Sequence, residues 1–335
     1  MTHPKITIIT PSFNQKEYLE ECMRSVHGQN HPAVEHIVVD GGSLDGSKEV
    51  IERFADRLTW WCSESDRGQS DAINKGLEHA SGGVFGWLNS DDLYLPGALA
   101  AVGEAFLADP GMLIFQGHRV LLHPDGSRER SVLNDPGQPG TLFTAPSVAQ
   151  QSTFYRMDAV REVGGIDPAL HYCMDLDLWW RVLFAFGTER LRTSAVDLAV
   201  FRLQAQSKTA QGTAGFVVET AALLHAMAEA TAQEDLAAML RLGHPELPAV
   251  RRSNARKEHA SIVRRMVYRF LVKWHASMAT PGEFAMLKRL RSIAGIDLAL
   301  EEEALDRRWK ELYPSLGAPE WNSFRLGRKL GLWKA

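Results

Sequence analysis

Two adjacent carboxylates, Asp91 and Asp92, follow directly after an apolar run at residues 84–88. A buried strand that ends in paired carboxylates supplies the oxygen ligands that a hard cation such as Mg²⁺ or Mn²⁺ prefers. Such an ion usually keeps a substrate phosphate in its coordination shell. Taken alone, residues 89–92 (NSDD) also favour a turn for purely local reasons. Two earlier strand ends with acidic and glycine-rich signals favour the cation site.

These earlier strand ends carry polar residues that suit a nucleotide. Asp40 and nearby glycines follow the apolar run at residues 36–39, where a carboxylate can accept hydrogen bonds from a base or a ribose and the backbone can approach closely. A simple Asp-Gly turn explains the same residues equally well. Residues 63–76 form the densest polar run, in which Arg67 and Lys75 would add positive charge to a helix start that favours phosphate. A solvated helix entry is the alternative there.

The first hundred residues alternate short apolar runs with segments of helical spacing. Strands are predicted at residues 6–10, 36–39, 58–62 and 84–88. Helices are predicted at residues 18–27, 47–55, 71–80 and 96–107, with Ser70 as the N-cap of the third. Continuous apolar strands joined by helices indicate a mostly parallel α/β sheet covered on both faces. Ligands of such sheets bind at the carboxyl ends of the strands.

The pattern changes after residue 111. Strands are predicted at residues 112–122, 152–156 and 195–202, and helices at residues 158–163 and 175–186. Residues 134–146 are rich in Pro, Gly and Thr, which favours a loop over the site. From residue 215 onward the spacing is almost entirely helical. We therefore expect a domain at residues 1–210 and a helical region at residues 211–335.

Composition narrows the class of protein. The chain has 335 residues, 45% hydrophobic and 23% charged, with a formal net charge of −4, which favours a folded globular protein and gives no global case for nucleic-acid binding. Its three cysteines are far apart and form no C-x-x-C pair, which favours reduced thiols. An early first strand and the absence of 18 consecutive apolar residues predict neither a signal peptide nor a membrane span. We expect a cytoplasmic protein.

Four segments, in this order, resemble the motifs of family 2 glycosyltransferases: residues 10–14, 39–46, 66–76 and 87–92. Weaker matches extend to about residue 205, and the helical region carries no resemblance. The resemblance implies the GT-A fold, which is Rossmann-like, and transfer of a sugar from a nucleotide diphosphate donor with inversion. It also implies that residues 1–95 bind the nucleotide-sugar and that residues 96–210 bind the acceptor.

The resemblance assigns roles to the matching positions. Asp91 would bind the Mg²⁺ or Mn²⁺ ion, because residues 89–92 stand where the family has its D-x-D motif. Asn89 replaces the first Asp of that motif. The positions implied to contact the nucleotide-sugar are Pro11, Ser12, Asn14, Asp40, Gly42, Asp66, Gln69, Asp71, Asn74, Lys75, Asn89, Ser90 and Asp92.

An inverting transfer needs a general base that deprotonates the acceptor hydroxyl. The family commonly places this base in a Glu-Asp pair at a helix start, where this chain has Met174 and Asp175. Asp175 is the first candidate for the base and Asp177 the second, although either carboxylate would also serve as a helix cap. The residues expected near the acceptor are Gln151, Ser152, His171 and Tyr172.

The helical region has a basic character. Eight Arg and Lys residues alternate with apolar residues between positions 251 and 273, and residues 324–334 repeat the pattern. Basic amphipathic helices suit an anionic membrane surface. A solvated helix packed on the catalytic domain is the alternative. The surface interpretation would suit a lipid-linked acceptor at the cytoplasmic face of the inner membrane.

The combined prediction is an inverting glycosyltransferase of bacterial surface polysaccharide synthesis. The donor would be a nucleotide-diphosphate sugar, for which UDP is the commonest carrier in the family, and the acceptor a saccharide or a lipid-linked saccharide. A nicotinamide enzyme is disfavoured, because no G-x-G-x-x-G follows the first strand. A sugar-nucleotide nucleotidyltransferase would need a Gly-rich basic loop at that place. A non-catalytic nucleotide-sugar-binding protein would keep Asp40 and Asp66 and need no base.

Overall fold

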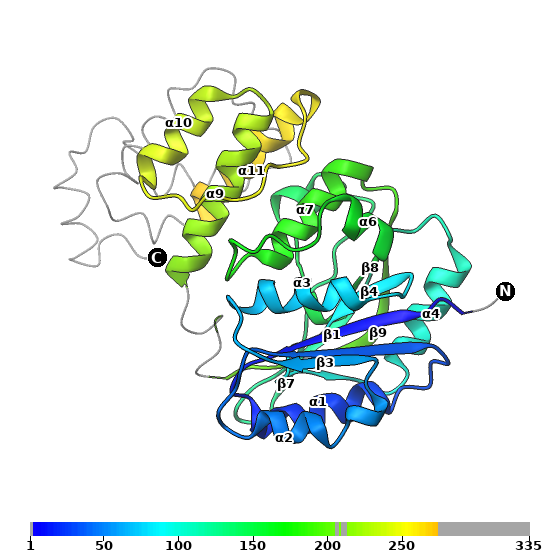
Figure 1. Cartoon of the computed structure of the whole chain (residues 1–335). Helices are drawn as coiled ribbons and strands as arrows, with labels where there is room; N and C mark the ends of the chain where they lie inside the picture. The colour runs from blue at the N-terminus through cyan, green and yellow to red at the C-terminus, as the bar shows by residue number, and fades with distance from the viewer. Residues whose placement is uncertain (1–2, 205–207, 209–212, 274–335) are drawn as a thin grey trace. The chain divides into compact units, whose positions relative to one another are not determined.

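The computed structural model describes residues 3–204, 208 and 213–273, and the chain divides into two compact units (Figure 1). The first unit comprises Met1–Leu142 and Pro146–Gly212. The second comprises Phe143–Ala145 and Thr213–Ala335. The division predicted between residues 210 and 211 is close to the start of this last segment.

One nine-stranded sheet organises the described part of the first unit. Its strands are β1 (Ile6–Ser12), β2 (Val34–Asp40), β3 (Trp60–Ser63), β4 (Val84–Trp87), β5 (Leu93–Tyr94), β6 (Ile114–Leu122), β7 (Arg128–Arg130), β8 (Thr153–Arg156) and β9 (Leu191–Arg202). Their order in space is β3-β2-β1-β4-β8-β6-β9-β5, and β7 pairs with β6. The two shortest strands, β5 and β7, were not predicted from the sequence.

The first four strands are parallel, as their continuous apolar sequences predicted. β1 pairs with β2 and with β4, and β2 pairs with β3. The second half of the sheet is mixed, because β8 runs antiparallel between β4 and β6. β9 lies parallel to β6 and antiparallel to β5. The parallel strands therefore deliver their carboxyl ends to one edge, while the later strands bring other loops beside it.

Helices cover both faces of this sheet (Figure 1). They are α1 (Lys16–His27), α2 (Ser47–Glu52), α3 (Gln69–His79), α4 (Ala98–Ala108), α6 (Met157–Glu162) and α7 (Met174–Phe186), with a short α5 (Thr141–Thr144) that was not predicted. α3 contacts β1 and β2 on one face, and α1 and α2 lie on the other. The N-cap prediction is corrected: α3 begins after Gly68, and the Ser70 hydroxyl inside the helix donates to the Leu170 carbonyl.

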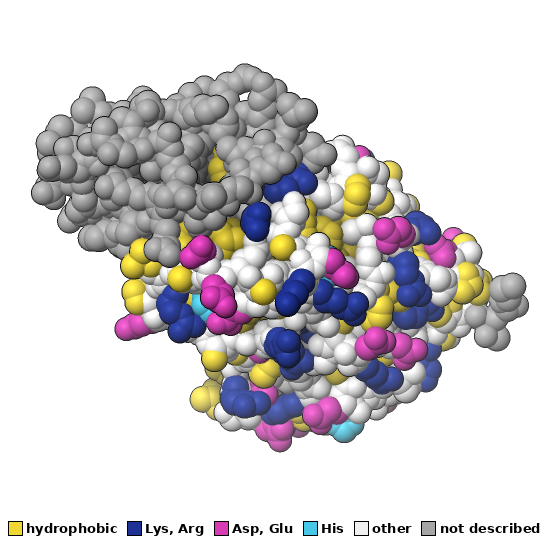
Figure 2. Space-filling view, turned by 90° about the horizontal axis from the view of Figure 1, so that it is seen from above, with side chains coloured by type: hydrophobic (Ala, Val, Ile, Leu, Met, Phe, Trp, Pro, Cys, Tyr) yellow, Lys and Arg dark blue, Asp and Glu magenta, His cyan; other side chains and the backbone are white. Residues whose placement is uncertain are grey.

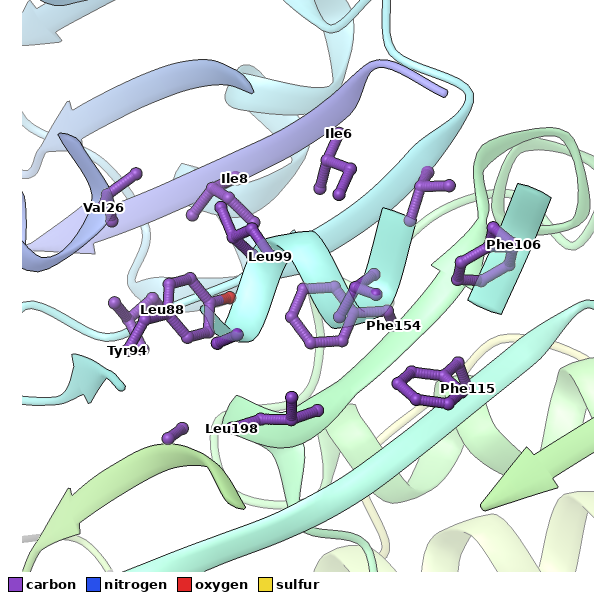
Figure 3. Packing of buried hydrophobic residues seen from close by; sticks show 14 of the residues in the cluster. Ile6, Ile8, Val26, Leu88, Tyr94, Leu99, Phe106, Phe115, Phe154 and Leu198 are labelled. Carbon is purple, nitrogen blue, oxygen red and sulfur yellow. The ribbon is translucent and has the colours of Figure 1, made fainter. Parts of the chain in front are cut away.

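A buried apolar cluster joins the early and late strands (Figure 3). Its labelled members are Ile6, Ile8, Val26, Leu88, Tyr94, Leu99, Phe106, Phe115, Phe154 and Leu198. The Phe154 ring of β8 packs over Gly86 of β4, where an added Cβ would lie 2.8 Å from the ring. The absence of a side chain at Gly86 therefore lets β8 settle beside β4.

The second unit is helical as far as it is described. It contains α9 (Thr213–Ala230), α10 (Glu234–Gly243) and α11 (Ala260–Lys273), and α9 contacts both other helices. In α11 the apolar residues Val263, Met266 and Val267 are buried. These side chains therefore do not form a free apolar face for a membrane. The second basic segment, residues 324–334, lies outside the described residues.

Two observations bear on the partners expected for the chain. None of the described helices is both long enough and apolar enough to cross a membrane. On the face shown in Figure 2, basic and acidic side chains are interspersed.

Candidate active site

The candidate site lies at the edge where the parallel strands end. Ser12 at the end of β1 is paired with Asp40 of β2, which is paired in turn with Ser63 of β3. β4 is parallel to β1, so the turn at residues 89–92 opens at the same edge. Ligands of parallel sheets bind at this edge, and three of the four sequence motifs end or begin there.

Asp40 anchors the loop that follows β2. Its carboxylate is fully buried, and its Oδ2 accepts hydrogen bonds from Ser43 N at 2.9 Å and from Ser63 Oγ at 2.7 Å. The Ser43 hydroxyl donates to the other carboxylate oxygen. At Gly42, where φ is +81°, an added Cβ would lie 3.1 Å from Ser65 N, so glycine is favoured and another residue would be strained. In this structure Asp40 holds the loop that follows β2, and its direct contact with a base stays a prediction.

Asn14 ties the loop after β1 to the loop after β2. Its backbone N–H donates to Ser43 Oγ at 2.7 Å, and its Oδ1 accepts from Leu44 N at 3.1 Å. Asn14 has φ +51°, a left-handed conformation that Asn tolerates better than most residues. Asn14 therefore helps to hold the two loops together, beside the hydrogen bonds from Gln15 N to Ser47 Oγ and from Lys16 N to Asp45 Oδ2. Pro11, the residue before Ser12, is buried within β1.

Three groups beside these loops offer contacts to a nucleotide. Ser12 Oγ is buried and has no hydrogen-bond partner among the described residues. Asp66 Oδ1 accepts from Gly68 N at 2.8 Å, and burial raises the pKa of Asp66 above its ordinary value. The Phe13 ring is 60% exposed. A Cβ added at Gly41 would lie 3.0 Å from Asp66 Oδ2 and 3.2 Å from Phe13 Cδ2, so these side chains are neighbours.

Two residues of α3 that were predicted to contact the nucleotide-sugar form ion pairs within the protein. Asp71 forms an ion pair of 2.7 Å with Arg67, whose hydrogen bond lowers the pKa of Asp71. Lys75 Nζ lies 2.9 Å from Glu64 Oε1, and this hydrogen bond raises the pKa of Lys75. Both pairs are near the surface, where exchange with a ligand phosphate costs little.

Asn74 has a structural task instead. Its Nδ2 donates to the Ile166 carbonyl at 2.9 Å, and its Oδ1 accepts from Ile166 N at 3.0 Å. This two-way bond clamps the turn at residues 164–166 against α3. Because the amide nitrogen and the amide oxygen are both used there, we no longer assign Asn74 a contact with the nucleotide-sugar.

The paired carboxylates after β4 differ in environment. Asp92 is fully buried, its Oδ2 accepts from Gln151 Nε2 at 2.8 Å, and its Oδ1 accepts from Arg202 N at 3.2 Å. Asp91 is half-buried and accepts from Gln204 Nε2 at 3.1 Å. Burial raises the pKa of Asp91. Burial, and then the charge of Asp91, raises the pKa of Asp92 well above its ordinary value. Asp92 therefore holds the turn, and Asp91 is the carboxylate left for a ligand.

The residues present fit a cation only in part. The Asn89 amide oxygen accepts from Gln69 Nε2 at 2.7 Å, and Ser90 is buried. The described residues contain no cluster of three or more His, Cys, Asp or Glu side chains that could hold a metal. A single carboxylate at Asp91 nevertheless suits Mg²⁺ or Mn²⁺ ions whose shell is completed by substrate phosphates and water. The geometry therefore fits an ion that arrives with the substrate, not a preformed metal centre.

The two candidates for the base are separated by burial. Asp177 is buried, and its Oδ2 lies 2.6 Å from Arg181 Nη2 in an i, i+4 ion pair of α7. The same guanidinium donates to the carbonyls of Val163 and Gly165. This pair fastens α7 to the preceding turn, so Asp177 is withdrawn as a base.

Asp175 occupies the first turn of α7 and is half-buried. Its Oδ1 accepts from the N–H of Leu176 at 2.8 Å. Burial raises the pKa of Tyr155 of β8, and the charge of Asp175 raises it further. Asp175 stays our candidate for the base.

The expected acceptor contacts are scattered. Ser152 is buried and its hydroxyl donates to the Ala149 carbonyl, so we no longer place it at the acceptor. Gln151 is buried and bound to Asp92. His171 is exposed and lies beside Gly68, directly before α3, which was predicted to contact the nucleotide-sugar. Tyr172 is half-buried.

Sequence reasoning missed three residues near these loops. Phe13 offers an exposed ring, and its signal was an aromatic residue directly after the first strand. Lys208 Nζ donates to Gln69 Oε1 and to the His171 carbonyl, each at 2.9 Å. Arg119 of β6 contacts Gln151. Neither basic residue belongs to a motif, so the sequence held no signal for them.

Comparison with known proteins identifies the catalytic fold. The family model described as glycosyl transferase family 2 matches residues 7–164. Residues 7–164 therefore resemble a family 2 glycosyltransferase domain. All four sequence motifs fall within the matched segment.

Curated relatives of this glycosyltransferase domain are similar over part of their length. An uncharacterised glycosyltransferase of Mycobacterium tuberculosis (strain ATCC 25618 / H37Rv) is 38% identical over 104 residues, which cover 30% of this chain and 40% of that protein. The putative teichuronic acid biosynthesis glycosyltransferase TuaG of Bacillus subtilis is 32% identical over 127 residues, which cover 37% of this chain and 50% of that protein. The chain thus spans half of the length of these two curated relatives or less.

Solved structures resemble nearly the whole chain. S. aureus TarS 1–349 in complex with UDP-GlcNAc has a TM-score of 0.65 and 14% identity, covering 98% of this chain and 92% of that one. The mannosyltransferase PcManGT of Pyrobaculum calidifontis in complex with GDP-Man and Mn²⁺ has a TM-score of 0.53 and 18% identity, covering 98% and 85%. At such identities the likeness establishes the fold alone, and it confirms the predicted GT-A architecture.

Proposed function

We propose that this glycosyltransferase moves a sugar from a nucleotide diphosphate to the hydroxyl of a saccharide or lipid-linked saccharide, with inversion at the anomeric carbon. The observation that carries the proposal is the set of incompletely satisfied groups at one sheet edge. Ser12 Oγ is buried without a partner, and burial raises the pKa of both Asp66 and Asp91. A nucleotide diphosphate with its cation supplies the donors and positive charge that these groups need.

The loops that follow β1 and β3 suit a nucleotide. The exposed Phe13 ring gives a base a surface for stacking, and the Asp66 carboxylate accepts from a base N–H or a ribose hydroxyl. Two structural relatives support a nucleotide-sugar donor, since they were solved with UDP-GlcNAc and with GDP-Man. UDP is the first nucleotide to test, because it is the commonest carrier in the family.

In the proposed mechanism Asp175 takes the proton from the acceptor hydroxyl as that oxygen attacks the anomeric carbon. The nucleotide diphosphate departs from the opposite face of the sugar, which inverts the configuration. A Mg²⁺ or Mn²⁺ ion bound at Asp91 supplies positive charge to the leaving diphosphate. Lys208, which bonds to Gln69 at the start of α3, adds a second positive charge near this edge.

The acceptor and the location are proposed more broadly. The similarity to the putative teichuronic acid glycosyltransferase of B. subtilis supports a role in bacterial surface polysaccharide synthesis. Arg252, Arg256 and Lys257 are exposed basic residues of the second unit. They support contact with an anionic membrane by charge, at the cytoplasmic face where lipid-linked acceptors are extended.

A donor screen tests the proposal. The full chain is incubated with UDP-, GDP- and dTDP-sugars with and without Mn²⁺, and release of the nucleotide is measured. We expect release from one donor class, with a dependence on the cation. A protein that binds a nucleotide diphosphate and releases nucleotide from no donor would instead be a non-catalytic nucleotide-sugar-binding protein.

A further inference from the structure

The turn at residues 89–92 begins with Asn89, an amide that stands where family 2 glycosyltransferases have the first Asp of the D-x-D motif. Its Oδ1 accepts from Gln69 Nε2 at 2.7 Å, and its Nδ2 donates to Gln150 Oε1 at 3.4 Å. Gln69 is the first residue of α3, and Gln150 is the first residue of the 3-10 helix η2 (Gln150–Ser152). The oxygen and the nitrogen of the Asn89 amide are therefore both used within the protein, each by a different element.

The orientation of these amides is fixed from both ends of the chain of hydrogen bonds. At one end Gln150 Nε2 donates to the Trp87 carbonyl at 2.5 Å, and a carbonyl can only accept. At the other end the Lys208 ammonium, which can only donate, lies 2.9 Å from Gln69 Oε1. Exchanging the oxygen and the nitrogen of any amide between these ends would place two donors or two acceptors against each other. We call Gln69, Asn89 and Gln150 the amide relay.

The same 3-10 helix holds the other end of the turn. Gln151, the residue after Gln150, donates through Nε2 to Asp92 Oδ2 at 2.8 Å, and both glutamines are buried. Asp91 lies between these two anchored ends and accepts from Gln204 Nε2 at 3.1 Å. The place of Asp91 in the turn therefore depends on the residues that hold Asn89 and Asp92.

A carboxylate at position 89 would be incompatible with the amide relay. An ionised Asp side chain has the shape of Asn but carries two acceptor oxygens and no donor. One of these oxygens would face Gln150 Oε1, which is also an acceptor as long as Gln150 Nε2 donates to the Trp87 carbonyl. Asn89 therefore satisfies contacts that the Asp of the motif could not satisfy here.

We propose that Asn89 is a positioning residue, which holds the turn that carries Asp91 to α3 and to η2 and supplies no ligand to the cation. The proposal rests on the proposed function where it takes Asp91 as the carboxylate for the cation of a nucleotide diphosphate. The amide relay itself belongs to the folded chain and is testable without a ligand. Asn89→Asp, which restores the D-x-D motif, should weaken the binding of a nucleotide with its cation, whereas a cation ligand at position 89 would strengthen it.

The first experiment measures the affinity of the full chain for UDP and GDP by calorimetric titration with and without Mn²⁺. In Asn89→Asp the affinity with Mn²⁺ is expected to fall by about 5-fold or more, the size of effect that a lost hydrogen bond of a buried group produces. Gln150→Met, which removes the amide and keeps the length of the side chain, should lower it as well. An equal or higher affinity in Asn89→Asp overturns the proposal. If Asn89→Asp does not fold, an unchanged affinity in Gln150→Met overturns it.

The matched control is Asn74→Asp on α3. Asn74 is half-buried like Asn89, and its amide also donates to one group and accepts from another, in this case the carbonyl and the N–H of Ile166. We expect Asn74→Asp to lower stability in urea denaturation and to leave the affinity with Mn²⁺ unchanged. An equal loss of affinity in Asn74→Asp would show a general effect of destabilisation and contradict the proposal.

The second experiment tests the amide relay without a ligand. Gln69 and Gln150 are each hydrogen-bonded to Asn89, so the loss of one amide should disturb the hydrogen bond of the other. The midpoint shifts of Gln69→Met and Gln150→Met in urea should therefore not add in the double variant, and they should add in chains that also carry Asn89→Ala. Additive shifts in both backgrounds overturn the proposal.

The two experiments separate this proposal from the proposed function. A wild type that binds neither nucleotide removes the proposed function, while non-additive urea shifts still support the hold of Asn89 on the turn. A wild type that binds a nucleotide with Mn²⁺, together with an Asn89→Asp variant that binds it equally well, keeps the proposed function and removes the positioning role.

Discussion

At the scale of single residues, Asp91 and Asp92 are adjacent but have different tasks. Both carboxylate oxygens of Asp92 accept hydrogen bonds, one from Gln151 and one from the backbone of Arg202. Asp91 accepts one hydrogen bond, from the Gln204 amide, and burial raises its pKa. We expect Asp91→Ala to remove most of the gain in UDP or GDP affinity that Mn²⁺ provides, because the ion loses its protein carboxylate. Calorimetric titration with and without Mn²⁺ measures this gain.

The control for that measurement is Asp125→Ala, which removes an exposed carboxylate of the turn after β6. It should leave the effect of Mn²⁺ unchanged. If Mn²⁺ improves nucleotide binding equally in Asp91→Ala, the ion is held elsewhere and our assignment of Asp91 is wrong.

Phe13 is the second residue whose role is open to direct measurement. Its ring is 60% exposed beside Gly41 and Asp66, so it contributes little to the core. Stacking of a base on an aromatic ring is worth about 1–3 kcal/mol. We expect Phe13→Ala to weaken nucleotide binding by roughly 5- to 150-fold with no loss of thermal stability.

Val132→Ala serves as the comparison, since Val132 is also apolar and 76% exposed but belongs to another part of the first unit. Its nucleotide affinity should match that of the wild type. A normal affinity in Phe13→Ala would exclude stacking at this position.

At the scale of elements, the contact of β4 with β8 depends on Gly86. An added Cβ would lie 2.8 Å from the Phe154 ring, which is fully buried in the cluster of Figure 3. Overpacking of a core costs about 1–3 kcal/mol. We expect Gly86→Ala to lower the free energy of unfolding by that amount in urea denaturation. Gly83→Ala, where an added Cβ meets nothing within 4 Å, should be close to neutral; equal stabilities of the two variants would contradict this packing.

β2 carries a buried histidine that makes the fold sensitive to acid. His36 Nδ1 lies 3.0 Å from His27 Nε2, and its Nε2 lies 3.0 Å from Thr10 Oγ1. Burial lowers the pKa of His36 to about 3. The unfolded chain therefore binds a proton at His36 between about pH 6.5 and pH 3 that the folded chain does not bind.

The free energy of unfolding should accordingly fall as the pH falls below 6.5, by up to about 1.4 kcal/mol per pH unit from this group. The raised pKa values of Asp91 and Asp92 act with the opposite sign, so a variant is needed to isolate the histidine. Urea denaturation between pH 7 and pH 5 should show a shallower decline in His36→Gln than in the wild type and in His79→Gln, an exposed histidine. Identical slopes in all three proteins would rule out this contribution.

At the scale of the whole molecule, the sequence predicted the parallel half of the sheet because its strands are continuous apolar runs that end in recognisable motifs. It did not predict that β8 runs antiparallel between β4 and β6, since a short apolar strand does not encode the direction of its partner. Polar residue types were also ambiguous. Asn74 lies within a motif and Asp177 lies two residues after the candidate base, yet one clamps a turn and the other pairs with Arg181.

Sequence patterns could not predict residues that only the fold brings to the site. Arg119 lies in a strand with no motif, and only the pairing of β6 with β8 and β9 sets it beside Gln151. Phe13 was present within a motif, but its role depends on exposure. Motifs therefore located the edge of the sheet, while burial and hydrogen bonding decided which side chains remain for ligands.

The most direct test of the account compares transfer by the wild type and by Asp175→Asn, with release of nucleotide from the accepted donor as the readout. Asp158→Asn, which changes an exposed carboxylate in the first turn of α6, is the matched control. We predict that Asp175→Asn keeps its nucleotide affinity and loses transfer by about 100-fold or more, because the contribution of a general base is roughly 10²–10⁴-fold. Equal transfer by Asp175→Asn and by the wild type would contradict the account.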